Sequence, residues 1–159
     1  MHGITGLRIA ALRLRLEAIS VFRAPEYKGA LFRGGFGQVF RDLVCVTREP
    51  VCTGCPHLES CSYSLCFETP VLRDKFPVLR KYPHAPHPFV LTPPLDPRTV
   101  LPPRVEFHVD VTLIGHGIDY LPHFLAVFDA MGRRGRHGGS FRVRAVSART
   151  GSPDSPLIL

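Results

Sequence analysis

The chain has 159 residues, which is enough for one hydrophobic core and short for two. With 45% hydrophobic and 21% charged residues, its composition is that of a globular protein. The apolar residues near the N-terminus are interrupted by Arg8, Arg13 and Arg15, which argues against a signal peptide. No stretch approaches the ~18 uninterrupted apolar residues that a membrane span needs.

Charge and cysteine content narrow the function classes. The chain carries 20 Lys and Arg residues against 13 Asp and Glu, a formal net charge of +7. This excess favours an acidic partner, of which nucleic acid is the commonest; the alternative is a basic surface that only keeps the protein in solution. Five cysteines without an export signal indicate a reducing compartment, so we expect a cytoplasmic protein with no membrane partner.

The first part of the chain predicts a strand followed by a helix. Residues 12–18 alternate between apolar and charged side chains, which is typical of a half-buried strand. Residues 28–43 place their large apolar side chains on one helical stripe. Gly34, Gly35 and Gly37 lie in this segment, each at a cost of about 1 kcal/mol relative to Ala. We therefore expect close packing against the helix, by the sheet, by another backbone or by a ligand.

The rest of the chain predicts an insertion and a second group of elements. Most of the sixteen prolines fall within residues 70–103, which indicates a long insertion with one short apolar strand at 89–91. Strict alternation predicts a strand at 105–113. Residues 118–131 predict a helix, with Pro122 in its first turn and Gly132 just past its end. Residues 141–145 predict a last strand with a basic outer face.

The resulting order of strand, helix, strand, strand, helix and strand is the βαββαβ pattern of ferredoxin-like domains, which RNA-recognition domains share. We therefore expect an α+β, ferredoxin-like domain over residues 1–150. Within it lie a cysteine-rich segment at 45–66 and the proline-rich insertion at 70–103. Residues 151–159 form a tail.

The cysteines form a cluster with the spacing C-x6-C-x2-C-x5-C-x4-C, made of Cys45, Cys52, Cys55, Cys61 and Cys66. A CxxC pair places two thiolates around one turn, and two further cysteines complete a tetrahedral sulfur shell that suits zinc. An iron–sulfur cluster, ordinary free thiols and a disulfide are the alternatives, and His57 is an alternative to one thiolate. A closed shell of four sulfurs has no open position for water, so the expected role is structural.

Several motifs occur in an order that resembles a known family. They are residues 29–37 (GALFRGGFG), the cysteines followed by Tyr63 and by Phe67 and Glu68, residues 86–91 (PHPFVL), 113–115 (LIG) and 120–122 (YLP), and Gly132 and Gly135 before an Arg-rich strand. Together they cover most of the chain. The sequence resembles the amino-terminal half of CRISPR-associated, repeat-RNA-processing endoribonucleases of the RAMP superfamily.

This resemblance implies a ribonuclease of antiviral defence that cuts precursor CRISPR RNA within its repeat and uses no catalytic metal. It also implies that Cys45, Cys52, Cys55 and Cys61 are the zinc ligands, since Cys66 falls where the family pattern varies. Family members carry two ferredoxin-like domains, and the second is absent from this sequence. We therefore expect CRISPR repeat RNA as ligand, a chain with the second RAMP domain or other CRISPR effector subunits as partners, and weak cleavage by this chain alone.

Metal-free RNA cleavage uses the 2′-hydroxyl of the RNA as nucleophile and needs a base, an acid and a cation near the phosphate. Family catalytic residues often lie near the first helix, where this sequence has no histidine. Histidine suits proton transfer because its reference pKa is about 6.5. The candidate catalytic residues are Tyr27, Lys28, His116 and His123, with His84 and His87 of the proline-rich insertion as further candidates.

Arginines provide the candidate RNA contacts. Several lie between Asp129 and Asp154 with no acidic residue among them, so we expect a continuous phosphate-binding strip there; a solvated basic face is the alternative. The predicted RNA-binding residues are Arg33, Arg133, Arg134, Arg136, Arg142 and Arg144. Two other functions compete with a nuclease half. They are a non-catalytic RNA-binding subunit of a CRISPR ribonucleoprotein complex and a small metal- or redox-binding protein.

Overall fold

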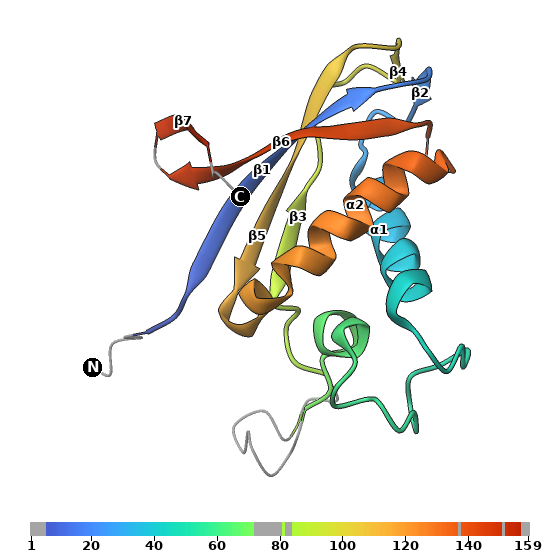
Figure 1. Cartoon of the computed structure of the whole chain (residues 1–159), viewed down its shortest axis with the longest axis vertical. Coiled ribbons are helices and arrows are strands. Elements are labelled where there is room, and N and C mark those ends of the chain that lie inside the picture. The colour runs from blue at the N-terminus through green and yellow to red at the C-terminus, as the bar shows by residue number, and fades with distance from the viewer. Residues whose placement is uncertain (1–5, 72–80, 82–83, 137, 151, 157–159) are drawn as a thin grey trace.

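The computed structural model describes residues 6–71, 81, 84–136, 138–150 and 152–156 (Figure 1). Each helix and strand expected from the sequence is present, with boundaries that differ by a few residues. The elements in chain order are β1 (Ile9–Ala18), β2 (Phe22–Arg23), α1 (Gly29–Val44), a π-helical turn (Ser64–Glu68), β3 (Phe89–Thr92), β4 (Val100–Leu101), β5 (Glu106–Ile114), a 3-10 turn (Gly115–Tyr120), α2 (Leu121–Arg134), β6 (Phe141–Thr150) and β7 (Ser152–Pro156).

The main sheet has five strands in the order β3-β5-β1-β6-β7. Each neighbouring pair in it is antiparallel. In the register of β1 and β5, Leu14 lies opposite Val109 and Arg13 lies opposite Asp110. Because side chains alternate along a strand, this register collects apolar residues on one face of the sheet and charged residues on the other. The protein therefore has an α+β fold built on an antiparallel sheet.

Both α1 and α2 cover the apolar face of this sheet (Figure 1). The core between the sheet and the helices is rich in phenylalanine. The Phe36 and Phe124 rings, one from each helix, lie 4.9 Å apart in a tilted arrangement that adds to their apolar burial. The opposite face of the sheet, called the open face below, is covered by no helix within the described residues. No helix in that part of the chain is long and apolar enough to cross a membrane.

The second helix ends later than the sequence predicts. Gly132, expected just past the end, lies inside α2 because its backbone packs against the last strand. A Cβ at this position would come within 2.2 Å of the Phe141 carbonyl oxygen. Gly135 ends the helix instead, with a left-handed φ of 63°. Pro122 does lie in the first turn of α2, as expected.

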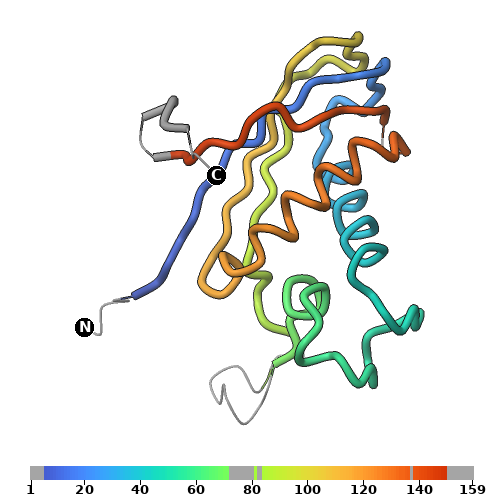
Figure 2. Tube along the Cα trace, viewed as in Figure 1, coloured from blue at the N-terminus to red at the C-terminus, as the bar shows by residue number. Residues whose placement is uncertain are grey.

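The crossover from α1 to β3 contains the cysteine-rich segment, which lies beyond the end of the helices (Figure 2). Its Phe67 ring packs on α1, and a Cβ on Gly37 would lie 3.0 Å from that ring. The close packing expected at the glycine-rich helix therefore comes from a side chain. The proline-rich insertion contributes β3 and β4. Its residues 72–80 and 82–83, and residues 151 and 157–159 of the expected tail, lie outside the described residues.

Two glycine substitutions test the packing of α2. Gly132→Ala is expected to destabilise the fold by about 1–3 kcal/mol, since the added methyl group overpacks the contact with Phe141. Gly34→Ala is the matched control, because no atom lies within 4 Å of its Cβ position. It should stabilise the fold by about 1 kcal/mol through helix propensity. Urea unfolding followed by circular dichroism measures both, and a stabilising Gly132→Ala would contradict the packing.

Candidate functional site

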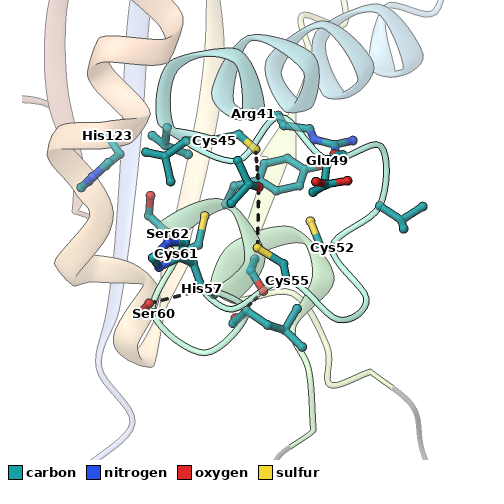
Figure 3. Close-up of a pocket in the computed structure, with 17 residues that line it drawn as sticks. Arg41, Cys45, Glu49, Cys52, Cys55, His57, Ser60, Cys61, Ser62 and His123 are labelled. Carbon is teal, nitrogen blue, oxygen red and sulfur yellow. Dashed lines mark hydrogen bonds between the residues drawn. The ribbon is translucent and has the colours of Figure 1, made fainter.

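Four of the five cysteines converge on one cavity of about 400 Å³ beyond the C-terminal end of α1. Figure 3 shows Cys45, Cys52, Cys55 and Cys61 around this cavity. Cys45 is the residue at which α1 ends, so the helix itself sets its position. These are the four cysteines that the sequence predicts as metal ligands.

The CxxC sequence forms a tight turn, as a pair of ligands on one knuckle requires. The N–H of Cys55 donates to the carbonyl of Cys52 at 3.0 Å. Gly54, between them, has a φ of 80°, a conformation that favours glycine. The N–H of Cys61 donates to the carbonyl of His57 at 2.8 Å, which begins a second turn and returns the chain to the cavity.

The four thiols surround the cavity without yet forming one shell. The Thr47 hydroxyl lies between two of them, 3.8 Å from the Cys45 sulfur and 3.7 Å from the Cys55 sulfur. Among the described residues, no three His, Cys, Asp or Glu side chains are close enough to hold one metal ion. The donor set nevertheless fits zinc in its chemistry, since it offers four thiols from two turns and a helix end. A shared ion would require the thiols to turn inward and Thr47 to leave its place between them.

The thiols differ in environment. Hydrogen bonds from the Arg48 main-chain N–H and from Thr47 lower the pKa of Cys45. Burial raises the pKa of Cys52, and the charge of Glu68 adds to the effect. Cys66 does not reach the cavity; it is fully buried in the core, and burial raises its pKa to about 12. Its placement fits the sequence-based choice to leave it out of the ligand set.

The open face of the sheet carries five arginines held by three carboxylates. Asp110 is 6% exposed and Glu17 is 8% exposed, so both carboxylates are nearly buried under the side chains that pair with them. The residues of this face are Arg13, Arg15 and Glu17 of β1, Glu106, His108 and Asp110 of β5, and Arg142, Arg144 and Arg149 of β6.

Each buried carboxylate binds two arginines. Glu17 accepts from Arg142 at 2.7 Å and lies 3.0 Å from Arg144. Asp110 accepts two hydrogen bonds from Arg13, at 2.8 and 2.9 Å, and one from Arg149 at 2.9 Å. Burial alone would raise the pKa of Asp110, but the hydrogen bonds and charge of Arg13, together with the charge of Arg149, outweigh burial and hold that pKa below its ordinary value.

The remaining predicted RNA-binding arginines lie on other elements. Arg133 pairs with Asp129 and Arg134 pairs with Asp42 of α1, both at 2.6 Å. Arg136 is exposed in the turn after α2. The expected strip is therefore divided between the last turn of α2 and the open face. Most of its arginines pair with a carboxylate from another part of the chain, outside residues 129–154.

Two predicted catalytic residues precede α1. Tyr27 is 70% exposed, and its ring lies over Gly29, where a Cβ would come within 2.5 Å of it. Lys28 is fully buried, and its ammonium donates to the carbonyls of Glu26 at 3.1 Å and Asp96 at 2.6 Å. Two main-chain acceptors satisfy a buried charge, so Lys28 has the surroundings of a structural residue.

The other two catalytic candidates lie at the start of α2. His116 is exposed in the 3-10 turn. His123 is exposed at the edge of the cysteine-lined cavity, with its ring 6.2 Å from that of Phe40 and 5.7 Å from that of Tyr120. The structure does not bring these histidines together with Tyr27 and Lys28, because the start of α1 and the start of α2 lie toward opposite ends of the sheet (Figure 1).

The structure does bring histidine to the first helix, where the sequence places none. His87 lies against the same two rings as the Arg33 guanidinium, which is 5.9 Å from the centre of Phe67 and 5.5 Å from that of Phe89. Its neighbour His84 is hydrogen-bonded to the main chain of Glu68. The sequence signal for this cluster is the pair of histidines in the proline-rich insertion, but their proximity to α1 depends on long-range packing.

These features define an α+β domain with an antiparallel sheet, a cysteine-lined cavity and an ion-paired, arginine-rich open face. Residues 7–158 match the family model AF_1859_N, described as an N-terminal domain. The chain belongs to this family.

One relative is an uncharacterized protein of Archaeoglobus fulgidus, which is 30% identical to the chain over 134 residues. The match covers 84% of this chain and 44% of the relative. The chain therefore spans less than half the length of the curated relative that it matches.

The Asp110 carboxylate makes a testable contribution to stability. Asp110→Asn should destabilise the fold by about 1–3 kcal/mol at pH 7, because two arginines lose a nearly buried charged acceptor. A lowered pKa in the folded state means that this contribution is present at neutral pH and is lost as the pH falls below about 4. The difference between the proteins in urea unfolding should therefore shrink in acid. The control is Glu106→Gln, which removes an exposed carboxylate on the same strand as Asp110, 3.8 Å from Arg15 of β1. It should change stability by less than about 0.5 kcal/mol; equal losses from both variants would contradict the special role of Asp110.

Proposed function

We propose that this chain is the RNA-binding, ferredoxin-like domain of a RAMP-type endoribonuclease that processes CRISPR repeat RNA in the cytoplasm. The strand order β3-β5-β1-β6, with α1 and α2 in the two crossovers, supports the topology, because it is the order that a βαββαβ chain takes in a ferredoxin-like sheet. The net charge of +7 supports a polyanionic ligand. The proposed reaction is the one that the resemblance to RAMP endoribonucleases implies.

The observation that carries the proposal is the arginine array of the open face. Its arginine side chains, Arg13, Arg15, Arg142, Arg144 and Arg149, are 36 to 59% exposed. The face has five arginines against Glu17, Glu106 and Asp110, so it retains an excess of two positive charges. Each guanidinium carries five N–H donors, and pairing with a carboxylate uses only one or two of them.

Anchored arginines suit phosphate binding for a physical reason. A long side chain loses conformational entropy when it is immobilised on a ligand. An arginine that is already paired with a buried carboxylate has less conformational freedom, so it loses less entropy when RNA binds. The exposed part of each of these side chains leaves donors accessible to a phosphate backbone. Contacts of this kind position a nucleic acid without reading its sequence.

A second candidate function is a non-catalytic RNA-binding subunit of a CRISPR ribonucleoprotein complex. The observation in its favour is the separation of Tyr27 and Lys28 from His116 and His123, together with the burial of Lys28. Incubation of repeat RNA in EDTA with this chain and a chain that carries the second RAMP domain separates the candidates. Products that end in a 2′,3′-cyclic phosphate support the nuclease, since attack of the 2′-oxygen on phosphorus then expels the 5′-oxygen. RNA that stays intact favours the binding subunit.

We also propose that Cys45, Cys52, Cys55 and Cys61 hold one structural zinc ion. The support is their convergence on one cavity and the knuckle turn at Cys52 and Cys55. When bound, zinc would crosslink the end of α1 to the segment that follows it and so stabilise this part of the fold. No step of RNA cleavage is assigned to the metal.

The open face is tested by two neutralising substitutions. The Arg15→Gln/Arg142→Gln variant should bind single-stranded repeat RNA more weakly, as fluorescence anisotropy at 50 and 200 mM salt can measure. The slope of log affinity against log salt should become shallower by about 1.4, since each lost phosphate contact accounts for ~0.7 on single strands. Glu17 keeps Arg144 in this variant.

The matched control is Arg98→Gln. Arg98 is a half-exposed arginine, paired locally with Asp96, that lies outside the open face. Its loss should leave RNA affinity almost unchanged. If wild-type protein fails to bind RNA at 50 mM salt, or if the double variant binds as well as Arg98→Gln, the proposed interface is wrong.

The zinc site is tested by elemental analysis. Protein purified without chelator should contain about one zinc ion per chain. Cys55→Ser should lower the zinc content and the melting temperature together, because metal binding and folding are coupled. Cys66→Ala, at the cysteine that faces the core, should retain the metal. Protein that carries neither zinc nor iron would contradict the site, and an iron content with a brown colour would replace zinc by an iron–sulfur cluster.

A further inference from the structure

A separate polar cluster lies where α1, the π-helical turn Ser64–Glu68 and residues 84–88 meet. It consists of Arg33, Glu68, His84 and His87, and it belongs neither to the cysteine-lined cavity nor to the open face. π-Helical turns often mark functional sites, because their extra residue redirects side chains. The cluster brings His87 to the same pair of aromatic rings that Arg33 of α1 contacts.

Arg33 offers a fixed positive charge to solvent. Its guanidinium lies over the rings of Phe89 and Phe67, at 5.5 and 5.9 Å from their centres. The residue is exposed, and no carboxylate lies within 4.0 Å of it among the described residues. Contact with the ring faces holds the guanidinium plane but leaves its N–H donors free. A guanidinium with free donors is a binding site for a phosphate group.

His84 is exposed and held in one orientation. Its Nδ1 lies 2.6 Å from the carbonyl oxygen of Glu68. A carbonyl oxygen only accepts, so Nδ1 carries the proton and donates this hydrogen bond. In the neutral imidazole the other ring nitrogen, Nε2, then presents a lone pair, and it accepts a hydrogen bond from a hydroxyl group.

The backbone beneath His84 is fixed by a conformation that costs energy. Thr69, which ends the π-helical turn, has φ 41° and ψ 57°, which is unfavourable for a β-branched residue by about 1–3 kcal/mol. Three hydrogen bonds offset this cost. The Thr69 N–H donates to Ser64 at 2.7 Å, its hydroxyl donates to the Ala85 carbonyl at 2.6 Å, and the Ala85 N–H donates to the Thr69 carbonyl at 2.8 Å. Thr69 thus binds Ala85, the neighbour of His84, to the π-helical turn whose Glu68 accepts the hydrogen bond from the His84 ring.

His87 links the two groups. Burial lowers its pKa, and the positive charge of Arg33 lowers it further. The His87 ring lies against the same two aromatic rings as Arg33, and His84 is hydrogen-bonded to Glu68, the sequence neighbour of one of these rings. The Nδ1 atom of His87 is buried and has no hydrogen-bond partner among the described residues, and the ring lies 6.2 Å from that of Phe67 and 6.0 Å from that of Phe89.

We propose that Arg33 and His84 form a subsite for one nucleotide of RNA, in which the Arg33 guanidinium binds the phosphodiester and His84 Nε2 accepts a hydrogen bond from the adjacent ribose 2′-hydroxyl. This subsite rests on the proposed RNA-binding function and adds to it a group that recognises ribose. The 2′-hydroxyl is the feature by which a protein distinguishes RNA from DNA at a given position. The proposed contacts of the open face are to phosphates, which RNA and DNA share, so they do not distinguish the two.

Two substitutions of His84 separate ligand binding from a structural role. Asn places an amide N–H near the position of Nδ1 and keeps the hydrogen bond to Glu68, but it has nothing in place of Nε2. Gln places its amide near Nε2 and loses the bond to Glu68. Arg33→Gln removes the phosphate contact, and Arg98→Gln is its charge-matched control. Each variant is measured by thermal unfolding and by anisotropy with a single-stranded RNA and with the 2′-deoxy strand of the same sequence.

The expected pattern is specific to each variant. His84→Asn should melt like the wild type and lose about two- to tenfold in RNA affinity with little change for the deoxy strand. His84→Gln should retain part of the preference for RNA and melt at a lower temperature. Arg33→Gln should weaken both strands alike, since the phosphate is common to them.

The outcomes distinguish this subsite from the proposed function. A wild-type protein that binds neither strand at 50 mM salt overturns both. If the wild type binds RNA but Arg33→Gln and His84→Asn bind like Arg98→Gln, only the subsite is wrong. Equal affinity of the wild type for the two strands, or a loss of stability in His84→Asn with an unchanged RNA preference, would show that His84 is structural.

Discussion

The fold depends on the requirement that the apolar face of a single sheet be covered by two helices. Phe36 stands at the centre of this contact, with the rings of Phe124, Phe128, Phe40, Phe67 and Phe89 between 4.9 and 6.1 Å away. Burial of large aromatic side chains is the strongest stabilising term in a chain of this size, and truncation of such a residue typically costs about 3–5 kcal/mol. Within the described residues both helices cover the same face of the sheet (Figure 1), and the other face carries charged side chains.

The charges of the open face follow from that requirement. A strand of alternating residues that buries Leu12, Leu14 and Leu16 must turn Arg13, Arg15 and Glu17 outward. Opposite charges on neighbouring strands attract, and the register places Arg13 opposite Asp110 and Glu17 opposite Arg142. Glu17 also lies opposite Glu106 of β5, and its pairing with Arg142 and Arg144 offsets that repulsion. The same pairs that stabilise the sheet hold the arginines in fixed positions, so structure and the proposed RNA contact share one set of residues.

The crossover between α1 and β3 carries the chemistry that the sheet does not. It lines the cysteine cavity together with the end of α1, and it carries Glu68, His84 and His87 of the polar cluster, to which α1 contributes Arg33. Phe67, in the π-helical turn Ser64–Glu68, packs against α1 at Gly37 and so attaches the crossover to the core. Zinc in the cavity would restrain the same turn from its other end. The proposed metal site and the proposed nucleotide subsite therefore both depend on this crossover and on its packing against the core.

The amino-acid sequence by itself determined the helices, the main strands and the α+β class, because these depend on periodicity over a few residues, which the chain carries locally. Its cysteine spacing predicted a metal-binding cluster, whereas the choice of the four cysteines that line the cavity came from the resemblance to RAMP endoribonucleases. The sequence did not determine which charges meet, because Glu17 and Arg142 are 125 residues apart and Arg13 and Asp110 are 97 apart. For the same reason the sequence did not show that the arginines between Asp129 and Asp154 pair with distant carboxylates. It also did not show that Lys28 is buried. Only the tertiary structure decided these points, together with the position of His84 beside α1, since strand register and long-range packing place side chains that are distant in sequence.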